Sequence, residues 1–289
     1  MSAGVLHVVA VPIGNLDDIS ARALTVLASV DVVAAEDTRC SGRLFQHYGL
    51  QRPLLALHDH NEAERVPALI ARLQAGESVA LISDAGTPLI SDPGYRLIAA
   101  AHDANIVVSP VPGACAAIAA LSAAGIASDR FFFEGFLPAK SVARQARLRD
   151  LAQTSATLIF YEAPHRIVET LVDMVAVLGE ARLVTMAREI TKTFETIRRD
   201  TLAELSEWVQ SDSNQQRGEI VLVVTGAPER AVGDQKLLSA EAVLKVLVKE
   251  LPLRQATAMT ADIFDLKRNA LYDMAMQIKA ELEIKRGDA

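Results

Sequence analysis

Short apolar runs alternate with segments of helical periodicity through the first 126 residues of the chain. The runs are nearly continuous in Val, Ile, Leu and Ala, which is typical of strands covered on both faces of a parallel sheet. Their alternation with helices predicts right-handed strand–helix–strand units, in which ligands bind beyond the carboxyl ends of the strands. The predicted strands are residues 6–12, 32–36, 54–57, 79–84 and 106–112, and the predicted helices are residues 19–29, 62–75 and 95–102.

A second set of alternating elements begins near Arg130. Its last two strands are candidates for an antiparallel pair, which would make this second sheet mixed. We therefore expect an α/β protein with a parallel-sheet domain at 1–126, a mixed-sheet domain at 127–228 and a helical extension at 236–289. The predicted strands are residues 131–136, 157–161, 183–187, 194–199 and 220–225; the helices are residues 142–153, 165–178 and 202–210, then 240–250, 253–264 and 267–283 after a polar linker at 227–235.

Composition and charge narrow the classes of protein. Hydrophobic residues make up 51% of the 289 positions, enough for a large core. No basic segment precedes an apolar stretch at the start, and no run of about 18 apolar residues is free of charge, so neither a signal peptide nor a membrane span is expected. Cys40 and Cys115 match neither a metal-ligand spacing nor a disulfide framework, which favours a reducing, cytoplasmic setting without a metal site.

The net charge of −7 counts mildly against a nucleic-acid partner, because such binders are often basic. Residues 1–126 hold 7 basic and 12 acidic side chains, so any phosphate contact has to come from a local patch. The best patch is PAKSVARQARLRD at 138–150, where Arg144 and Arg147 are neighbours at helical spacing. These cations suit a phosphate backbone, although an ordinary solvated helix face explains them equally well.

Three predicted strands end in loops rich in glycine and proline. The sequence SDAGTPLISDPGY at 83–95 is longer and more polar than an ordinary turn of about two to six residues, which favours a cofactor loop. VPIGNLDD at 11–18 lacks the glycines of a dinucleotide fingerprint and the Gly-Lys of a phosphate-binding loop, and a plain helix start explains it as well. VPGACAA at 111–117 also fits tight packing of a helix on the sheet.

Charged side chains collect at three further strand ends. EDTR at 36–39, FYEAPHR at 160–166 and AREITKTFE at 187–195 each offer carboxylates beside cations. The alternative interpretations are a surface salt-bridge cluster, a helix N-terminus and a β-hairpin with cross-strand charge pairs, respectively.

These motifs, followed in order along residues 5–226, resemble the tetrapyrrole methylase superfamily, and within it the branch that acts on ribosomal RNA. FEGFLPAK and GEIVLVV belong to the same ordered set, and the C-terminal helices resemble the extension found in many members. The superfamily's Gly-Asp-Pro loop reads Gly86, Thr87 and Pro88 here, a departure typical of the RNA-acting branch.

The resemblance implies S-adenosylmethionine as the cofactor, folded between the two α/β domains, and a homodimer. It implies transfer of a methyl group to the ribose 2′-hydroxyl of a cytidine in the decoding region of 16S rRNA, within the 30S subunit. It also implies these cofactor-binding residues: Pro12, Gly86, Thr87, Pro88, Ile90, Ser91, Asp92, Ala114, Cys115, Tyr161, Glu162, Ala187 and Gly218.

Methyl transfer to a hydroxyl requires removal of its proton. Our hypothesis is that Asp37 or Glu189 orients or deprotonates the hydroxyl, while Arg39, Arg166 and Lys192 hold nearby phosphates. The expected RNA-binding residues are Lys140, Arg144, Arg147, Arg149 and Arg166.

Other functions stay open at this point. The nearest alternative is methylation of a porphyrin or corrin precursor on the same fold; methylation of a modified histidine on a translation factor is a second. A non-catalytic ribosome-assembly factor would bind RNA without using the cofactor loops. A nucleotide-binding oxidoreductase lacks the required glycine pattern.

Overall fold

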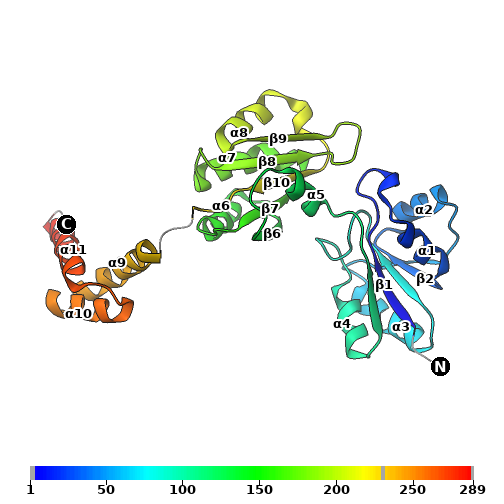
Figure 1. Ribbon diagram of the computed structural model, residues 1–289, viewed down its shortest axis with the longest axis horizontal. Coiled ribbons are helices and arrows are strands. Elements are labelled where there is room, and N and C mark those ends of the chain that lie inside the picture. Colours follow the sequence, from blue (N-terminus) through cyan, green and yellow to red (C-terminus); the bar gives the residue numbers. More distant parts are fainter. Residues whose placement is uncertain (1–3, 229–231, 288–289) are drawn as a thin grey trace. The chain divides into compact units, whose positions relative to one another are not determined.

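The computed structural model describes residues 4–228 and 232–287, and it forms two compact units, Met1–Ala227 and Pro228–Ala289. The larger unit contains two five-stranded sheets, and the smaller unit is helical. Figure 1 labels most of the helices and strands of both units, and each unit is described by itself below.

The first sheet is entirely parallel, with strand order β3-β2-β4-β1-β5. Alternate residues of its strands pack into two separate cores: Val32 and Ala34 of β2 lie in one, and Val33 and Ala35 lie in the other. This burial on both faces confirms the predicted parallel sheet. The elements are β1 (Val5–Val9), η1 (Leu16–Asp18), α1 (Ala21–Ser29), β2 (Val32–Ala35), α2 (Thr38–His47), β3 (Leu54–Ala56), α3 (Glu62–Gln74), β4 (Val79–Ile82), α4 (Tyr95–Asp103), β5 (Val107–Val111) and α5 (Ala116–Ala123).

The second sheet is mixed, with strand order β6-β7-β10-β8-β9; β6 and β7 are parallel and the other pairs are antiparallel. The mixed sheet is confirmed, but the suggested pairing of its last two strands is wrong, since β8 separates β9 from β10. The cause is hydropathy: all five residues of β10 are buried, so it is central, whereas β9 carries five charged or polar side chains among its six residues, as suits an edge strand. The elements are β6 (Phe131–Phe136), α6 (Ser141–Leu151), β7 (Thr157–Glu162), η2 (Pro164–Arg166), α7 (Ile167–Leu178), β8 (Leu183–Arg188), β9 (Thr196–Thr201), α8 (Leu202–Ser211), η3 (Ser213–Gln216) and β10 (Ile220–Val224).

Helix α5 follows the last strand of the first sheet but packs on the second sheet. Ala117, Ala120 and Leu121 form one buried cluster with Ile159 and Val223. Helices α6, α7 and α8 contribute to the other core of this sheet. The loop before α5 therefore runs between the strand ends of the two sheets.

The smaller unit consists of α9 (Val232–Glu250), α10 (Leu253–Phe264) and α11 (Arg268–Gly287). They share a small core that includes Leu244, Ala256 and Leu271. Helix α9 begins within the linker predicted at 227–235, whose residues 229–231 lie outside the described residues. Across the described ranges, no helix combines the length and the apolarity needed to cross a bilayer.

Candidate functional site

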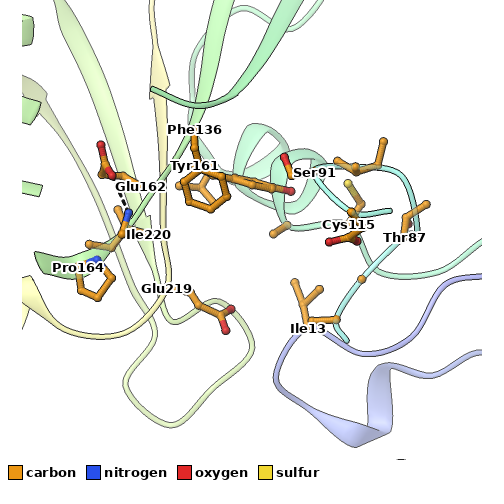
Figure 2. A pocket seen from close by; sticks show the side chains of 17 residues that line it. Ile13, Thr87, Ser91, Cys115, Phe136, Tyr161, Glu162, Pro164, Glu219 and Ile220 are labelled. Atoms are coloured by element: carbon orange, nitrogen blue, oxygen red, sulfur yellow. Dashed lines mark hydrogen bonds between the residues drawn. The ribbon is translucent and has the colours of Figure 1, made fainter. Parts of the chain in front are cut away.

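A cavity of about 390 Å³ lies in the larger unit, beyond the carboxyl ends of several strands and the amino end of the antiparallel β10. Figure 2 shows its two sides: Ile13, Thr87, Ser91 and Cys115 come from loops of the first sheet, and the opposite side comes from the second sheet. Its lining is mainly apolar with a few polar groups, which is the usual character of a small-molecule pocket. The lining residues are Ile13, Ala85, Gly86, Thr87, Ile90, Ser91, Asp92, Cys115, Ala116, Phe136, Tyr161, Glu162, Ala163, Pro164, Glu219, Ile220 and Val221.

The loop after β4 is held in shape by backbone hydrogen bonds to its neighbours. Gly86 and Val11 exchange two hydrogen bonds, from Val11 N to Gly86 O at 2.9 Å and from Gly86 N to Val11 O at 3.1 Å. The Thr87 hydroxyl donates to Ala114 O at 2.9 Å. Gly86 has φ +78°, a backbone conformation that favours glycine, and an added Cβ would lie 3.2 Å from Ile13 Cγ2. A larger residue at this position would therefore be both strained and crowded.

Aromatic rings form the opposite side of the cavity. Tyr161 lies at an angle to Phe133 and Phe136, with ring centroids 5.0 and 5.7 Å away. The Tyr161 hydroxyl accepts a hydrogen bond from Ala117 N at 3.2 Å, and burial raises the pKa of Tyr161. The hydroxyl therefore stays protonated at neutral pH and reaches from the second sheet to the start of α5.

Asp92 is the carboxylate whose environment is most unusual among those lining the cavity. Burial raises the pKa of Asp92 to about 6, the charges of Glu36 and Asp84 add to the rise, and a hydrogen bond from Ser83 opposes it. A carboxylate with a pKa near neutrality can exchange a proton under working conditions.

Eight of the thirteen predicted cofactor residues line this cavity, and the other five do not. Pro12 lines a different cavity, and Pro88 and Ala187 are buried in the fold. Ala114 contributes its carbonyl to Thr87. The eight that line the cavity are Gly86, Thr87, Ile90, Ser91, Asp92, Cys115, Tyr161 and Glu162.

Gly218, the fifth, packs against Glu189: a Cβ there would meet Glu189 Cδ at 2.3 Å. Glu189 accepts hydrogen bonds at Oε1 from Lys192 Nζ and Glu219 N, both at 2.9 Å. Burial acts to raise the pKa of Glu189, but these hydrogen bonds outweigh it and leave the pKa lowered. Burial likewise acts to lower the pKa of Lys192, yet its bond to Glu189 leaves it raised. Both groups are therefore ionised, and neither is a ready proton acceptor.

Asp37 is the N-cap of α2, a helix that the sequence reasoning missed. Its Oδ1 accepts from Arg39 N at 2.8 Å, and its carboxylate pairs with the Arg39 guanidinium at 2.7 Å. The hydrogen bonds from Arg39 lower the pKa of Asp37. The half-buried Asp37 and the exposed Arg39 thus form a capping pair, and neither lines the 390 Å³ cavity.

Glu162 and Arg166 form a buried pair beneath the cavity. Arg166 donates to Glu162 Oε1 from Nε at 2.8 Å and from Nη2 at 2.6 Å, and Thr170 donates to Oε2 at 2.6 Å. Since the Glu162 side chain is 1% exposed and that of Arg166 is 17% exposed, their shared role is to fix the start of α7. Arg166 is therefore not part of an RNA-binding surface.

The predicted basic patch divides into inward and outward members. Arg144 is 1% exposed and pairs with Asp173 at 2.7 Å, so it is unavailable to RNA. Arg147 is half-buried and forms a bidentate ion pair with Glu134. Lys140 and Arg149 are exposed and remain suitable for a phosphate backbone.

Several cavity residues were missed although they lie in motifs that the sequence displays. Ile13 follows Pro12 in the first loop, Phe136 ends β6, and Glu219 precedes β10. Because side chains alternate along a strand, every second residue can be assigned to the same side of a sheet. Which of the two sets faces the cavity depends on how the strands pair in the folded sheet. In the described part of the chain, no group of three or more His, Cys, Asp or Glu residues is arranged to hold a metal ion.

Comparison with known proteins identifies the class. The profile described as Tetrapyrrole (Corrin/Porphyrin) Methylases matches residues 5–206, so the chain belongs to the tetrapyrrole methylase family and is a methyltransferase. The profile RsmI C-terminal HTH domain matches residues 235–279.

Curated relatives narrow the family further. Ribosomal RNA small subunit methyltransferase I of Pseudomonas aeruginosa is 59% identical over 96% of this chain and 98% of its own length. The protein of that name from Escherichia coli O157:H7 is 52% identical over 96% of each chain. Within the tetrapyrrole methylases, the chain therefore belongs with the ribosomal RNA small subunit methyltransferase I proteins.

Solved structures show the same fold. The methyltransferase CobJ has a TM-score of 0.59 and 21% identity, covering 80% of this chain and 98% of its own. Diphthine synthase has a TM-score of 0.58 and 16% identity, covering 77% of this chain and 90% of its own. At these identities the likeness carries the fold alone.

Proposed function

We propose that the chain transfers a methyl group from S-adenosylmethionine to the ribose 2′-hydroxyl of a cytidine in the decoding region of 16S rRNA. Its substrate form is the 30S subunit, and it works as a cytoplasmic homodimer. The observation that carries the proposal is the cavity at the strand ends, in a chain 45–59% identical to several curated ribosomal RNA small subunit methyltransferase I proteins.

The residues around the cavity fit S-adenosylmethionine. A volume of about 390 Å³ falls within the range of roughly 300–1,000 Å³ for small-molecule pockets. The faces of Phe136 and Tyr161 and the carboxylates of Asp92 and Glu219 favour a cation such as a sulfonium. Gly86 lets the backbone approach the ligand closely. When bound, the cofactor supplies an activated methyl group, so the protein's main contribution is positioning.

We infer that Asp92 accepts the proton of the 2′-hydroxyl more readily than Asp37 or Glu189. Asp92 lines the cavity with a pKa of about 6, whereas hydrogen bonds lower the pKa values of the other two carboxylates, from Arg39 to Asp37 and from Glu219 N and Lys192 to Glu189. A raised pKa makes a carboxylate a stronger base while leaving most of it ionised at neutral pH.

The test uses purified enzyme, labelled S-adenosylmethionine and 30S subunits that lack the modification. Wild-type enzyme is expected to label 16S rRNA at a ribose, and calorimetry is expected to show saturable binding of S-adenosylhomocysteine. A parallel assay with a uroporphyrinogen-type precursor covers the principal alternative. Labelling of the precursor without labelling of RNA, or no cofactor binding, would overturn the proposal.

A further inference from the structure

A second cavity, of about 240 Å³, lies beside the first. The wall between them is the bridge of Val11 with Gly86: Ile13 lines the first cavity, while Gly14 lines the second. The loop after β4 is divided in the same way, with Asp84 on the second cavity and Ala85 on the first. A ligand in the second cavity is thus one loop's thickness from a ligand in the first.

The second cavity contains a buried hydroxyl with no partner. Ser41 on α2 is 4% exposed, and its Oγ makes no hydrogen bond. A buried polar group without a partner costs about 1–3 kcal/mol, so such a group in a cavity indicates a ligand that completes it. The fold does not require this hydroxyl, since it supports no neighbour.

Two charged side chains line the same cavity as Ser41 and can still form hydrogen bonds with a ligand. Arg43 lines the cavity, is exposed, and makes no hydrogen bond or ion pair with the described residues. Asp84 Oδ1 accepts from Asp37 N at 3.0 Å, which orients the carboxylate and leaves its second oxygen for a ligand. Apolar contacts come from Pro12, Leu16 and Leu44.

This set of groups suits cytosine, the base of the proposed acceptor. Cytosine presents an amino donor at N4, which Asp or Glu accepts, next to acceptors at N3 and O2. Its flat faces suit apolar walls, and the volume lies below the usual range for larger ligands. Enzymes that modify single nucleotides take the target out of its stack into a fitted pocket.

We propose that the second cavity holds the base of the target cytidine. Asp84 accepts from the N4 amino group, Arg43 donates to the N3 and O2 side, and the Ser41 hydroxyl makes the remaining hydrogen bond. The ribose then lies over the Val11–Gly86 wall, with its 2′-hydroxyl facing the first cavity. This inference rests on the proposed function, because it names the subsite for the proposed acceptor.

The kinetic test compares 30S subunits that carry cytidine or uridine at the target position. Arg43→Ala and Ser41→Ala are each expected to lower kcat/KM by about tenfold or more, with unchanged affinity for S-adenosylhomocysteine. Asp84→Asn is expected to reduce the preference for cytidine over uridine, because an amide both accepts and donates. Arg65→Ala is the matched control, since Arg65 is an exposed arginine on α3 that lines neither cavity.

Stability separates a ligand-binding role from a structural one. Because the Ser41 hydroxyl has no partner, Ser41→Ala should leave the urea midpoint unchanged or raise it while activity falls. The inference is overturned if Arg43→Ala and Ser41→Ala retain wild-type kcat/KM and Asp84→Asn retains wild-type discrimination.

Saturation-transfer NMR with cytidine 5′-monophosphate tests the subsite without turnover. The nucleotide signal is expected with wild-type protein saturated with S-adenosylhomocysteine, and its loss is expected with Ser41→Leu, which fills the cavity. Signal and loss without any methylation of 30S subunits would overturn the proposed function but support the subsite. Normal methylation with a signal that survives in Ser41→Leu would overturn the subsite alone.

Discussion

At the scale of single residues, Arg144 and Arg149 show how one helix divides its cations between fold and surface. Removing Arg144 leaves the buried Asp173 carboxylate without its cation, and such losses cost about 3–5 kcal/mol. Arg149→Ala removes only an exposed side chain, so we expect a stability change within about 0.5 kcal/mol and weaker binding to 30S subunits. Urea denaturation and filter binding check both variants. Equal stability of the two would contradict this division.

Asp92 links pH to both stability and rate. Because folding raises its pKa from 3.8 to about 6, the folded protein binds this proton more tightly, and the free energy of unfolding falls as pH rises from about 4 to 6. The full shift would correspond to roughly 3 kcal/mol, which solvent screening of this half-buried carboxylate reduces, so Asp92→Asn should have a free energy of unfolding about 2 kcal/mol above wild type at pH 8 and little difference near pH 4. Urea titrations at the two pH values measure this.

The same substitution should lower kcat by about 100-fold or more if Asp92 is the proton acceptor. Wild-type kcat should fall as pH drops below about 6, where Asp92 becomes protonated. Asp37→Asn and Glu189→Gln serve as comparisons, since their carboxylates do not line the cavity. A fully active Asp92→Asn variant would instead indicate Asp37 or Glu189 as the proton acceptor.

Sequence spacing indicates which residues share a helix face, but not which way that face points. Arg144 is buried because Asp173, 29 residues away on α7, neutralises it. Arg166 is engaged by Glu162, four residues earlier, which was itself predicted to bind the cofactor. The glycine- and proline-rich loops predicted the cavity lining better than the charged residues predicted the RNA-binding surface, because the backbone shape of these loops is set by the local sequence.

At the scale of elements, the loop after β4 depends on residues in the left-handed region. Gly86→Ala adds strain of about 1–2 kcal/mol at φ +78° and crowds Ile13 at 3.2 Å. We expect a similar loss of stability and at least tenfold weaker binding of S-adenosylhomocysteine by calorimetry. Gly49→Ala is the control: φ is +64°, nothing lies within 4 Å of its added Cβ, and only stability should change.

The predicted elements agree with the structure where hydrophobic periodicity is strong. The five parallel strands and the helices α1, α3 and α4 were found, since each buries a regular apolar face. Helix α2 was missed because only Ser41 and Phe45 are buried along it. The pairing of β9 with β10 was mispredicted because their order along the chain was given more weight than their hydropathy, which marks the apolar β10 as central and the polar β9 as an edge strand.

At the scale of the whole molecule, contacts between the two sheets of the larger unit are close. An added Cβ at Gly14 would meet Lys192 Cγ at 2.5 Å, and one at Gly135 would meet Ser91 Oγ at 3.2 Å. Both contacts flank the 390 Å³ cavity, since Ser91 lines it and Lys192 pairs with Glu219. Loops of both sheets therefore enclose the proposed cofactor cavity within the larger unit.

Removal of residues 228–289 tests what the smaller unit contributes. Its three helices have their own core, and none of its described residues, 228 and 232–287, lines either cavity, so the fragment 1–227 should bind S-adenosylhomocysteine with wild-type affinity. Arg254, Lys267 and Arg268 are exposed and can contact phosphates, and each such contact would add to the salt-dependent affinity for RNA. We expect the fragment to bind 30S subunits more weakly, with a shallower dependence of log Kd on log salt. The triple alanine variant of these cations in the full chain should reproduce part of that change, whereas unchanged RNA affinity in both proteins would assign the smaller unit a role other than RNA binding.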